Sequence, residues 1–191
     1  MIMFGGFVEM WGVDHSFTLR HYIEAFSVDW VKERGFLWTG TAWNSFNTTF
    51  TIALISSLPT AAIGILTAYL LTRHKFKGKN AFEFGTMLSF AIPGSVIGVS
   101  YVFAFNVPPL EITGTGIILV IAFVFRNMPV GVRAGIAAMN QLDPHLDEAS
   151  STLNASSAQT FRNIILPLLK PAITASLVFS FVRAMTAISA V

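Results

Sequence analysis

The sequence predicts an all-α fold, a polytopic bundle of membrane helices. Hydrophobic residues make up 53% of the 191 residues and charged residues 12%, about half the charged share of an ordinary soluble domain. The mean hydropathy is +0.64. A soluble fold of this size leaves roughly 30% of its unfolded surface exposed to water, which this composition cannot cover with polar groups. The composition therefore argues against a soluble enzyme or a disordered regulator.

The net charge, the cysteine content and one missing motif exclude further classes of function. The formal net charge of +2 is too small for a nucleic-acid footprint. The chain has no cysteine, so it has no disulfide framework, thiolate metal site or cysteine nucleophile. A phosphate-binding loop is also missing, because Gly78-Lys79-Asn80 lacks the earlier glycine and the hydroxyl residue. We expect no cofactor and no metal site in this chain.

Four stretches are long and apolar enough for membrane helices, which need about 20 residues. They cover about 47–72, 82–105 and 116–139, and a span that begins near 171. The first two are almost free of charge, whereas the third contains Arg126 and Arg133 and the fourth contains Arg183. An arginine at mid-membrane costs roughly 2.5–3.5 kcal/mol on insertion scales. Arg126 and Arg183 therefore either line a hydrated pathway or extend to the membrane interface.

Both ends of the chain resemble interruptions of a longer protein. Residues 1–13 are apolar but too short to span, and Glu9 lies among them, so we interpret them as the end of an earlier membrane helix. The chain stops at Val191 inside an apolar pattern, without a cap or a turn signal. We expect a bundle that is incomplete at both ends.

The basic residues predict the orientation in the membrane. Residues 73–79 carry four Lys and Arg, whereas the connection over 106–115 carries none. The positive-inside rule places the first connection in the cytoplasm and the second outside. A segment over 14–45 is then periplasmic, 46–191 forms the transmembrane domain, and the loop over 140–170 is cytoplasmic. Four tryptophans in or beside the periplasmic segment either anchor at the membrane interface or pack a small subdomain: Trp11, Trp30, Trp38 and Trp43.

The cytoplasmic loop is patterned as two short helices at a sharp turn. Asp143 is placed to cap a helix that begins at Pro144 and runs to about 153. Asn154 tolerates the left-handed conformation that ends such a helix. Ser156 and Gln159 have the spacing of a capping box for a second helix. An apolar stripe comes next on one helix face, comprising Phe161, Ile164, Ile165, Leu168 and Leu169. Pro167 and Pro171 then redirect the chain toward the membrane.

This loop resembles the cytoplasmic loop of permeases in bacterial ATP-binding-cassette importers. In that family Glu-Ala-Ala precedes a Gly, and an Ile and Leu-Pro come after it at fixed spacings. The matching residues are Glu148, Ala149, Ser150, Asn154, Ile164, Leu166 and Pro167. Ser150 stands where the family has its second Ala and Asn154 where it has the Gly. Both departures keep the physical property, because Ser is small and Asn can adopt the conformation of Gly.

The resemblance extends along most of the chain. Trp43-Asn44-Ser45, the four residues 68–71 and Ile92-Pro93-Gly94 also look like family segments. Residues 181–191 are similar to the ferric-iron subgroup, whose permeases often hold two such units in one chain. In the family the loop lies between the fourth and fifth of six helices. Counting 1–13 as the first helix gives the same position here. The resemblance thus implies the type I importer permease fold.

The resemblance also implies the partners and the mechanism. A multi-pass permease of the bacterial inner membrane forms the pathway with a second unit, either fused or separate. Each loop inserts a coupling helix into a cleft of a cytosolic ATPase subunit, which binds the ATP. A periplasmic binding protein delivers the cargo, which we expect to be ferric iron. The permease itself is not an enzyme.

Roles for the loop residues are implied by the same resemblance. Glu148 would meet basic groups on the ATPase, or would only favour the first turn of its own helix through the dipole. Ala149 and Ser150 are small enough for the helix to enter the cleft deeply, and Asn154 sets the turn.

Other interpretations of the whole chain stay open. Polyamine, thiamine or phosphonate are alternative cargoes, and a membrane anchor that docks a cytosolic partner without transport is an alternative of a different class.

Overall fold

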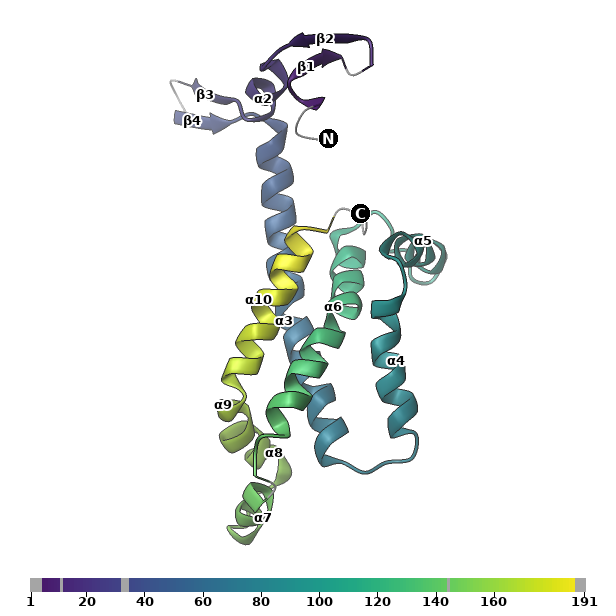
Figure 1. Ribbon diagram of the computed structural model, residues 1–191, viewed down its shortest axis with the longest axis vertical. Helices are drawn as coiled ribbons and strands as arrows, with labels where there is room; N and C mark the ends of the chain where they lie inside the picture. The colour runs from purple at the N-terminus through teal and green to yellow at the C-terminus, as the bar shows by residue number, and fades with distance from the viewer. Residues whose placement is uncertain (1–4, 11, 32–34, 144, 188–191) are drawn as a thin grey trace. The chain divides into compact units, whose positions relative to one another are not determined.

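The computed structural model describes residues 5–10, 12–31, 35–143 and 145–187 (Figure 1). The chain divides into two compact units, Met1–Thr51 and Ile52–Val191. The first unit carries short strands, and the second is built from helices. Helix α3 (Thr41–Arg73) starts in the first unit and continues into the second.

The first unit contains two antiparallel hairpins separated by one short helix. Strand β1 (Val8–Met10) pairs with β2 (Asp14–Phe17), and β3 (Val28–Val31) pairs with β4 (Gly35–Trp38). Helix α2 (Arg20–Ala25) lies between the hairpins in sequence. In the second hairpin, Val28 is opposite Trp38 and Val31 is opposite Gly35.

The expected end of a membrane helix over residues 1–13 is contradicted at Val8–Met10, which form a strand. Gly12 has φ of 87°, a left-handed conformation that lets the chain reverse between β1 and β2. Such a reversal directly after three residues favours a hairpin over a continued helix. Residues 1–4 and Trp11 lie outside the described residues.

Aromatic packing in the first unit favours one of the two interpretations of the tryptophans. The rings of Trp38 and Trp43 meet edge to face with centroids 4.3 Å apart, and Phe26 meets Trp43 at 5.7 Å. Edge-to-face contacts of this kind stabilise small apolar clusters. Trp38 and Trp43 therefore pack a subdomain. The side chains of Trp11 and Trp30 lie outside the described part of the chain.

The second unit holds the expected membrane helices. Helix α6 (Gly116–Met139) has the bounds that the sequence predicted, and α3 extends the expected first span at both ends. Helix α10 (Lys170–Met185) starts within a residue of the predicted position. Among the described residues, α3 and α6 are each long and apolar enough to cross a membrane, and the number of candidate spans rises to as many as four if each of two bent helix pairs counts as one span.

The second predicted span is not one helix, and this prediction was wrong. Helix α4 (Lys79–Ala91) and α5 (Gly94–Phe105) meet at an angle of 107° (Figure 1). Pro93 explains the break, because it has no N–H and its ring excludes the helical conformation from the preceding residue. Ile92 accordingly has an extended backbone, with φ of −86° and ψ of 133°.

The core of the second unit forms where α3, α6 and α10 meet. Helices α6 and α10 pack along one another (Figure 1). On α3, Gly64 lies so close to Gly131 of α6 that a Cβ added at Gly64 would stand 3.1 Å from the Gly131 backbone. The largest buried cluster gathers residues from all three helices and from the segment before α10: Ile65, Ala68, Met139, Ile165, Leu169 and Ala172.

Candidate coupling loop and membrane arginines

The loop between α6 and α10 begins with two short helices and a left-handed turn. Helix α7 spans His145–Thr152 and α8 spans Ser157–Thr160. The carboxylate of Asp143 accepts the N–H of His145 at 2.9 Å, and Asn154 has φ of 57°. Ser156 and Gln159 form a complete capping box, with bonds of 2.8 and 3.3 Å. These contacts confirm the cap and turn predicted from Asp143, Asn154 and Ser156. Pro144 lies outside the described residues.

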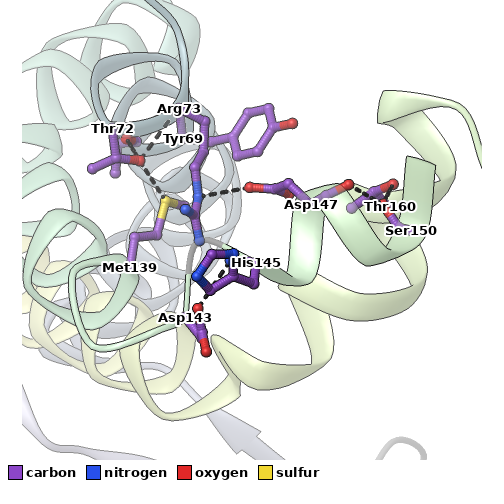
Figure 2. A network of polar contacts seen from close by, with 10 residues as sticks. Tyr69, Thr72, Arg73, Met139, Asp143, His145, Asp147, Ser150 and Thr160 are labelled. Carbon is purple, nitrogen blue, oxygen red and sulfur yellow. Dashed lines mark hydrogen bonds and ion pairs between the residues drawn. The ribbon is translucent and has the colours of Figure 1, made fainter. Parts of the chain in front are cut away.

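A chain of polar contacts joins the end of α3 to both short helices (Figure 2). We call Arg73, Asp147, Ser150 and Thr160 the polar chain. Arg73 Nε lies 3.2 Å from Asp147 Oδ2. Ser150 Oγ donates to the backbone oxygen of Asp147 at 2.9 Å, and its oxygen lies 2.7 Å from Thr160 Oγ1. The polar chain thus runs from α3 through α7 to α8.

The first link of the polar chain is an ion pair without an aligned hydrogen bond. Arg73 Nε and Nη2 are buried and have no hydrogen-bond partner among the described residues. The side chain of Arg73 is only 14% exposed, and that of Asp147 is 34% exposed. Water screens such a pair less than one on the open surface.

The predicted loop residues divide into exposed and internal positions. Glu148 and Ala149 are exposed on α7. Ser150 is 4% exposed and faces Thr160 inside this chain, so its small size serves the contact between α7 and α8. The resemblance implied that the small size of Ser150 lets α7 enter an ATPase cleft. In the structure the side chain faces α8 instead, because the i+1 position on a helix points about 100° away from Ala149.

Glu148 also influences its neighbour His145. The carboxylate lies 3.1 Å from His145 Nδ1. That hydrogen bond, together with the weaker effect of the charges of Asp143 and Glu148, raises the pKa of His145 above the ordinary histidine value. A protonated His145 would leave Glu148 partly neutralised, so the charge that α7 presents depends on pH.

The apolar stripe after α8 is only partly internal. Ile165 and Leu169 are fully buried, and Phe161 and Ile164 are half-buried, but Leu168 is 49% exposed. Residues Phe161–Ile165 form a π-helix, in which the N–H of Leu166 reaches the oxygen of Phe161. A π turn holds an extra residue and rotates the residues after it about the helix axis. The prediction for Leu168 was therefore wrong, because an α-helical period was assumed.

The remaining loop residues carry the chain into α10. Leu166 is half-buried and begins a short helix, α9 (Leu166–Leu168), in which Pro167 is exposed. The helices before and after this point are bent by 72°. Pro167 and Pro171 each lack an N–H, so helical hydrogen bonds are missing at the bend.

The two arginines singled out in the membrane helices have different surroundings. Arg126 Nη1 is buried, without a hydrogen-bond partner among the described residues, and the guanidinium lies where a Cβ on Gly94 would stand. Arg183 is exposed and lies 6.0 Å from the ring centroid of Phe90 and 5.9 Å from that of Phe179. Each arginine thus contacts a residue beside the break between α4 and α5.

The third arginine of the predicted membrane helices, Arg133, forms an ion pair: its Nη1 lies 3.4 Å from Glu83 Oε1. In the part of the chain that the structure describes, no group of three or more His, Asp or Glu residues is placed to hold a metal ion.

Comparison with known proteins decides the family. Residues 60–191 match the family described as the inner membrane component of binding-protein-dependent transport systems. The chain belongs to this family. Membership confirms the expected resemblance and the inner-membrane location. It also assigns the chain to a transport component rather than a catalyst.

Three similar proteins differ in their sequence identity to this chain and in how much of their own length the chain covers. A putative ferric transport system permease protein of Haemophilus influenzae is 49% identical over 190 residues, covering 100% of this chain and 29% of that protein. A ferric transport system permease protein of Actinobacillus pleuropneumoniae is 48% identical, and the chain covers 26% of it. A sulfate transport system permease protein of Salmonella typhimurium is 30% identical over 77% of this chain and 57% of that protein. The chain thus spans little more than a quarter of the ferric relatives.

A solved structure confirms the fold. The inward-facing MetNI methionine ABC transporter matches with a TM-score of 0.61, over 76% of this chain and 71% of that chain, at 19% identity. The predicted all-α importer permease fold is therefore correct.

The polar chain is not predictable from the sequence patterns used above. Arg73 is visible in the sequence only as part of the basic run that sets orientation, and nothing there singles out Asp147 or Thr160. No local spacing signals a contact between residues so distant in sequence. One cue exists, since an acid in the first turn of a cytoplasmic helix and a basic residue at the end of a membrane helix are natural ion-pair partners.

Proposed function

We propose that this chain is part of the permease subunit of an ATP-driven importer, and that its cargo is ferric iron. The observation that carries the cargo is the identity of 49% and 48% to ferric permease proteins across the whole chain. Sulfate is the second candidate, since the sulfate permease is 30% identical. The higher identity favours iron. We include in the proposal a cytosolic ATPase, a periplasmic binding protein and a second permease unit.

Helix α7 would be the part that docks on the ATPase. It presents Glu148 and Ala149 to solvent, as a coupling helix requires. Asn154, in its left-handed conformation, sets the angle between α7 and α8. Ile164, Leu166 and Pro167 then carry the chain back into the bundle through the π-helix and the 72° bend. ATP would bind to the partner and not to this chain.

Arg126 and Arg183 would belong to the pathway through the membrane. Arg126 has a buried guanidinium nitrogen without a partner among the described residues, and Arg183 lies near two phenylalanine rings, one on α4 and one on α10. A cation at membrane depth is stable only near water, a polar partner or an aromatic face. Both sites support a hydrated space beside the break at Pro93.

Site-specific cross-linking in the full-length protein tests the docking surface. The chain has no cysteine, so Ala149→Cys gives a single reactive position here in a background made cysteine-free elsewhere. Thr113→Cys, in the connection predicted to lie outside, is the matched control. We expect Ala149→Cys to capture a cassette ATPase and Thr113→Cys to capture none. Capture from both positions, or from neither, would overturn the docking proposal.

Uptake into proteoliposomes tests the cargo. The full-length protein would be reconstituted with its ATPase and its binding protein. We expect ATP-dependent uptake of ferric iron and not of sulfate. Capture of the ATPase without uptake of any cargo would instead support a membrane anchor.

A further inference from the structure

We infer that the ion pair between Arg73 and Asp147 transmits movement of α7 to membrane helix α3 during transport. The inference rests on the proposed function, in which α7 docks on an ATPase. It assigns Arg73 and Asp147 a positioning role and places neither of them in contact with ATP or with cargo. Helices α7 and α3 are attached to the fold in different ways, and this difference supports the role.

Helix α7 is attached by polar contacts. In the described part of the chain, none of its residues belongs to the three buried apolar clusters. Leu153, which directly succeeds α7, is 83% exposed. The polar chain ties α7 to its neighbours, through Asp147 to α3 and through Ser150 to α8. Elements with few buried apolar contacts move more readily than packed ones.

The end of α3 is firmly packed. Ala68 is 0% and Leu71 is 2% exposed, and they belong to two different clusters of the core. Thr72 Oγ1 lies 3.0 Å from the sulfur of Met139 on α6. Arg73 therefore stands at the end of a rigid helix, one residue beyond this contact with α6. A pull on its guanidinium acts on α3 and through it on α6.

A pocket lies beside the ion pair. A pocket of about 190 Å³ is lined by α3, α7 and α8, including Tyr69, His74 and Ser157 together with the polar chain. Part of the space between α3 and α7 is therefore free of side chains, and the ion pair joins the two helices beside it (Figure 2). Such an arrangement lets α7 pivot while Asp147 stays attached to Arg73.

An ion pair that only held α7 in place would have the same geometry as one that transmits movement. The experiment must therefore measure coupling separately from the attachment of α7. The variants are Asp147→Asn and Arg73→Gln, which remove one charge at similar size, and the exchange Arg73→Asp with Asp147→Arg. The matched control is Glu83→Gln, which breaks a separate ion pair near the cytoplasmic end, between α4 and α6. All are made in the full-length protein with its ATPase and binding protein in proteoliposomes.

Three quantities are measured: the ATPase that co-purifies, the ATP hydrolysed, and the iron taken up per ATP. We expect both single variants to retain the ATPase and hydrolyse ATP. We expect uptake per ATP to fall about tenfold, within the range usual for coupling between distant sites. The exchange should recover most of the ratio, and Glu83→Gln should stay near wild type.

Four results would overturn the inference. They are a wild-type ratio in both single variants, an equal fall in Glu83→Gln, loss of the ATPase in proportion to uptake, and no recovery in the exchange. The third result would leave the ion pair a structural support of α7 alone. If the unaltered protein binds no ATPase and takes up no iron, the proposed function itself fails, and this inference with it.

Discussion

Helices α3 and α6 meet backbone to backbone at Gly64 and Gly131, whereas α7 meets its neighbours through an ion pair and two hydroxyls. At the first contact even a methyl group on Gly64 would lie 3.1 Å from the Gly131 backbone, so the two helices approach closely and leave little room for displacement. The second contact tolerates small displacements, because hydrogen bonds and ion pairs act over a range of distances and angles. The comparison indicates a rigid helix contact at Gly64 and Gly131 and a less tightly held α7.

The largest expected effect comes from a charge reversal on the exposed face of α7, which changes the surface proposed to dock on the ATPase and not the packing of the helix. Glu148→Arg should abolish ATP-dependent uptake and leave membrane insertion unchanged, because Glu148 is exposed and the hydrogen bond of its side chain goes to His145 within the same helix. Uptake by proteoliposomes and protease mapping of topology measure the two properties. Glu111→Arg, in the connection predicted to be external, is the charge-matched control. Wild-type uptake in Glu148→Arg would remove Glu148 from the coupling surface.

The next effect breaks the rigid contact. Gly64→Val should lower the free energy of unfolding by about 2–3 kcal/mol, because its Cβ would already lie 3.1 Å from the Gly131 backbone and its methyl groups would overlap it. Thermal unfolding in detergent measures the loss. Gly98→Val is the control, since nothing lies within 4 Å of a Cβ there. Equal melting of the two variants would contradict the close approach of α3 and α6.

A smaller effect sharpens the role of the turn between α7 and α8. Asn154 has φ of 57°, and a β-branched residue in this region costs roughly 1–2 kcal/mol. Asn154→Val should therefore weaken the loop and reduce cross-linking from position 149, while Asn154→Gly should match the wild type. Proteolysis of the loop in inverted membrane vesicles compares the two. Equal cleavage of both variants would show that the turn does not depend on the left-handed residue.

The smallest effect concerns the charge that α7 presents. The hydrogen bond that His145 Nδ1–H donates to Glu148, together with the charges of Asp143 and Glu148, raises the pKa of His145 in the folded protein. The contact therefore contributes stability below the unfolded pKa, and this contribution is lost as pH rises through the higher folded value. Magnetic resonance of labelled histidine should give a pKa above the ordinary value, and Glu148→Gln should lower it. An unchanged pKa in Glu148→Gln would assign the shift to Asp143 alone.

Local patterns in the sequence were sufficient to predict the caps and the turn of the loop. The cap at Asp143, the turn at Asn154 and the box at Ser156 each depend on residues within three or four positions, so their spacing determines the structure. The bounds of α6 were predictable for a similar reason, because hydropathy over some 20 residues sums many weak preferences.

Other features depend on contacts that spacing does not encode. Pro93 was compatible with a mild bend or a full break, and only the packing of α4 and α5 gives the angle of 107°. The π-helix at Phe161–Ile165 holds one extra residue, which turns Leu168 toward the surface. A strictly periodic pattern cannot predict such an insertion. Arg73 and Asp147 come from different elements, so the ion pair required the folded arrangement. The strand at Val8 was missed because three residues are too short to show alternation.

Gly94 has a consequence for how charge is placed in the membrane. The Arg126 guanidinium occupies the volume that a side chain at position 94 would need. Gly94→Ala would remove no charged group from the protein, yet its methyl group would force the Arg126 guanidinium into another position. A single methyl group at position 94 would therefore move the positive charge of Arg126 without removing it, whereas Arg126→Ala would remove the charge altogether.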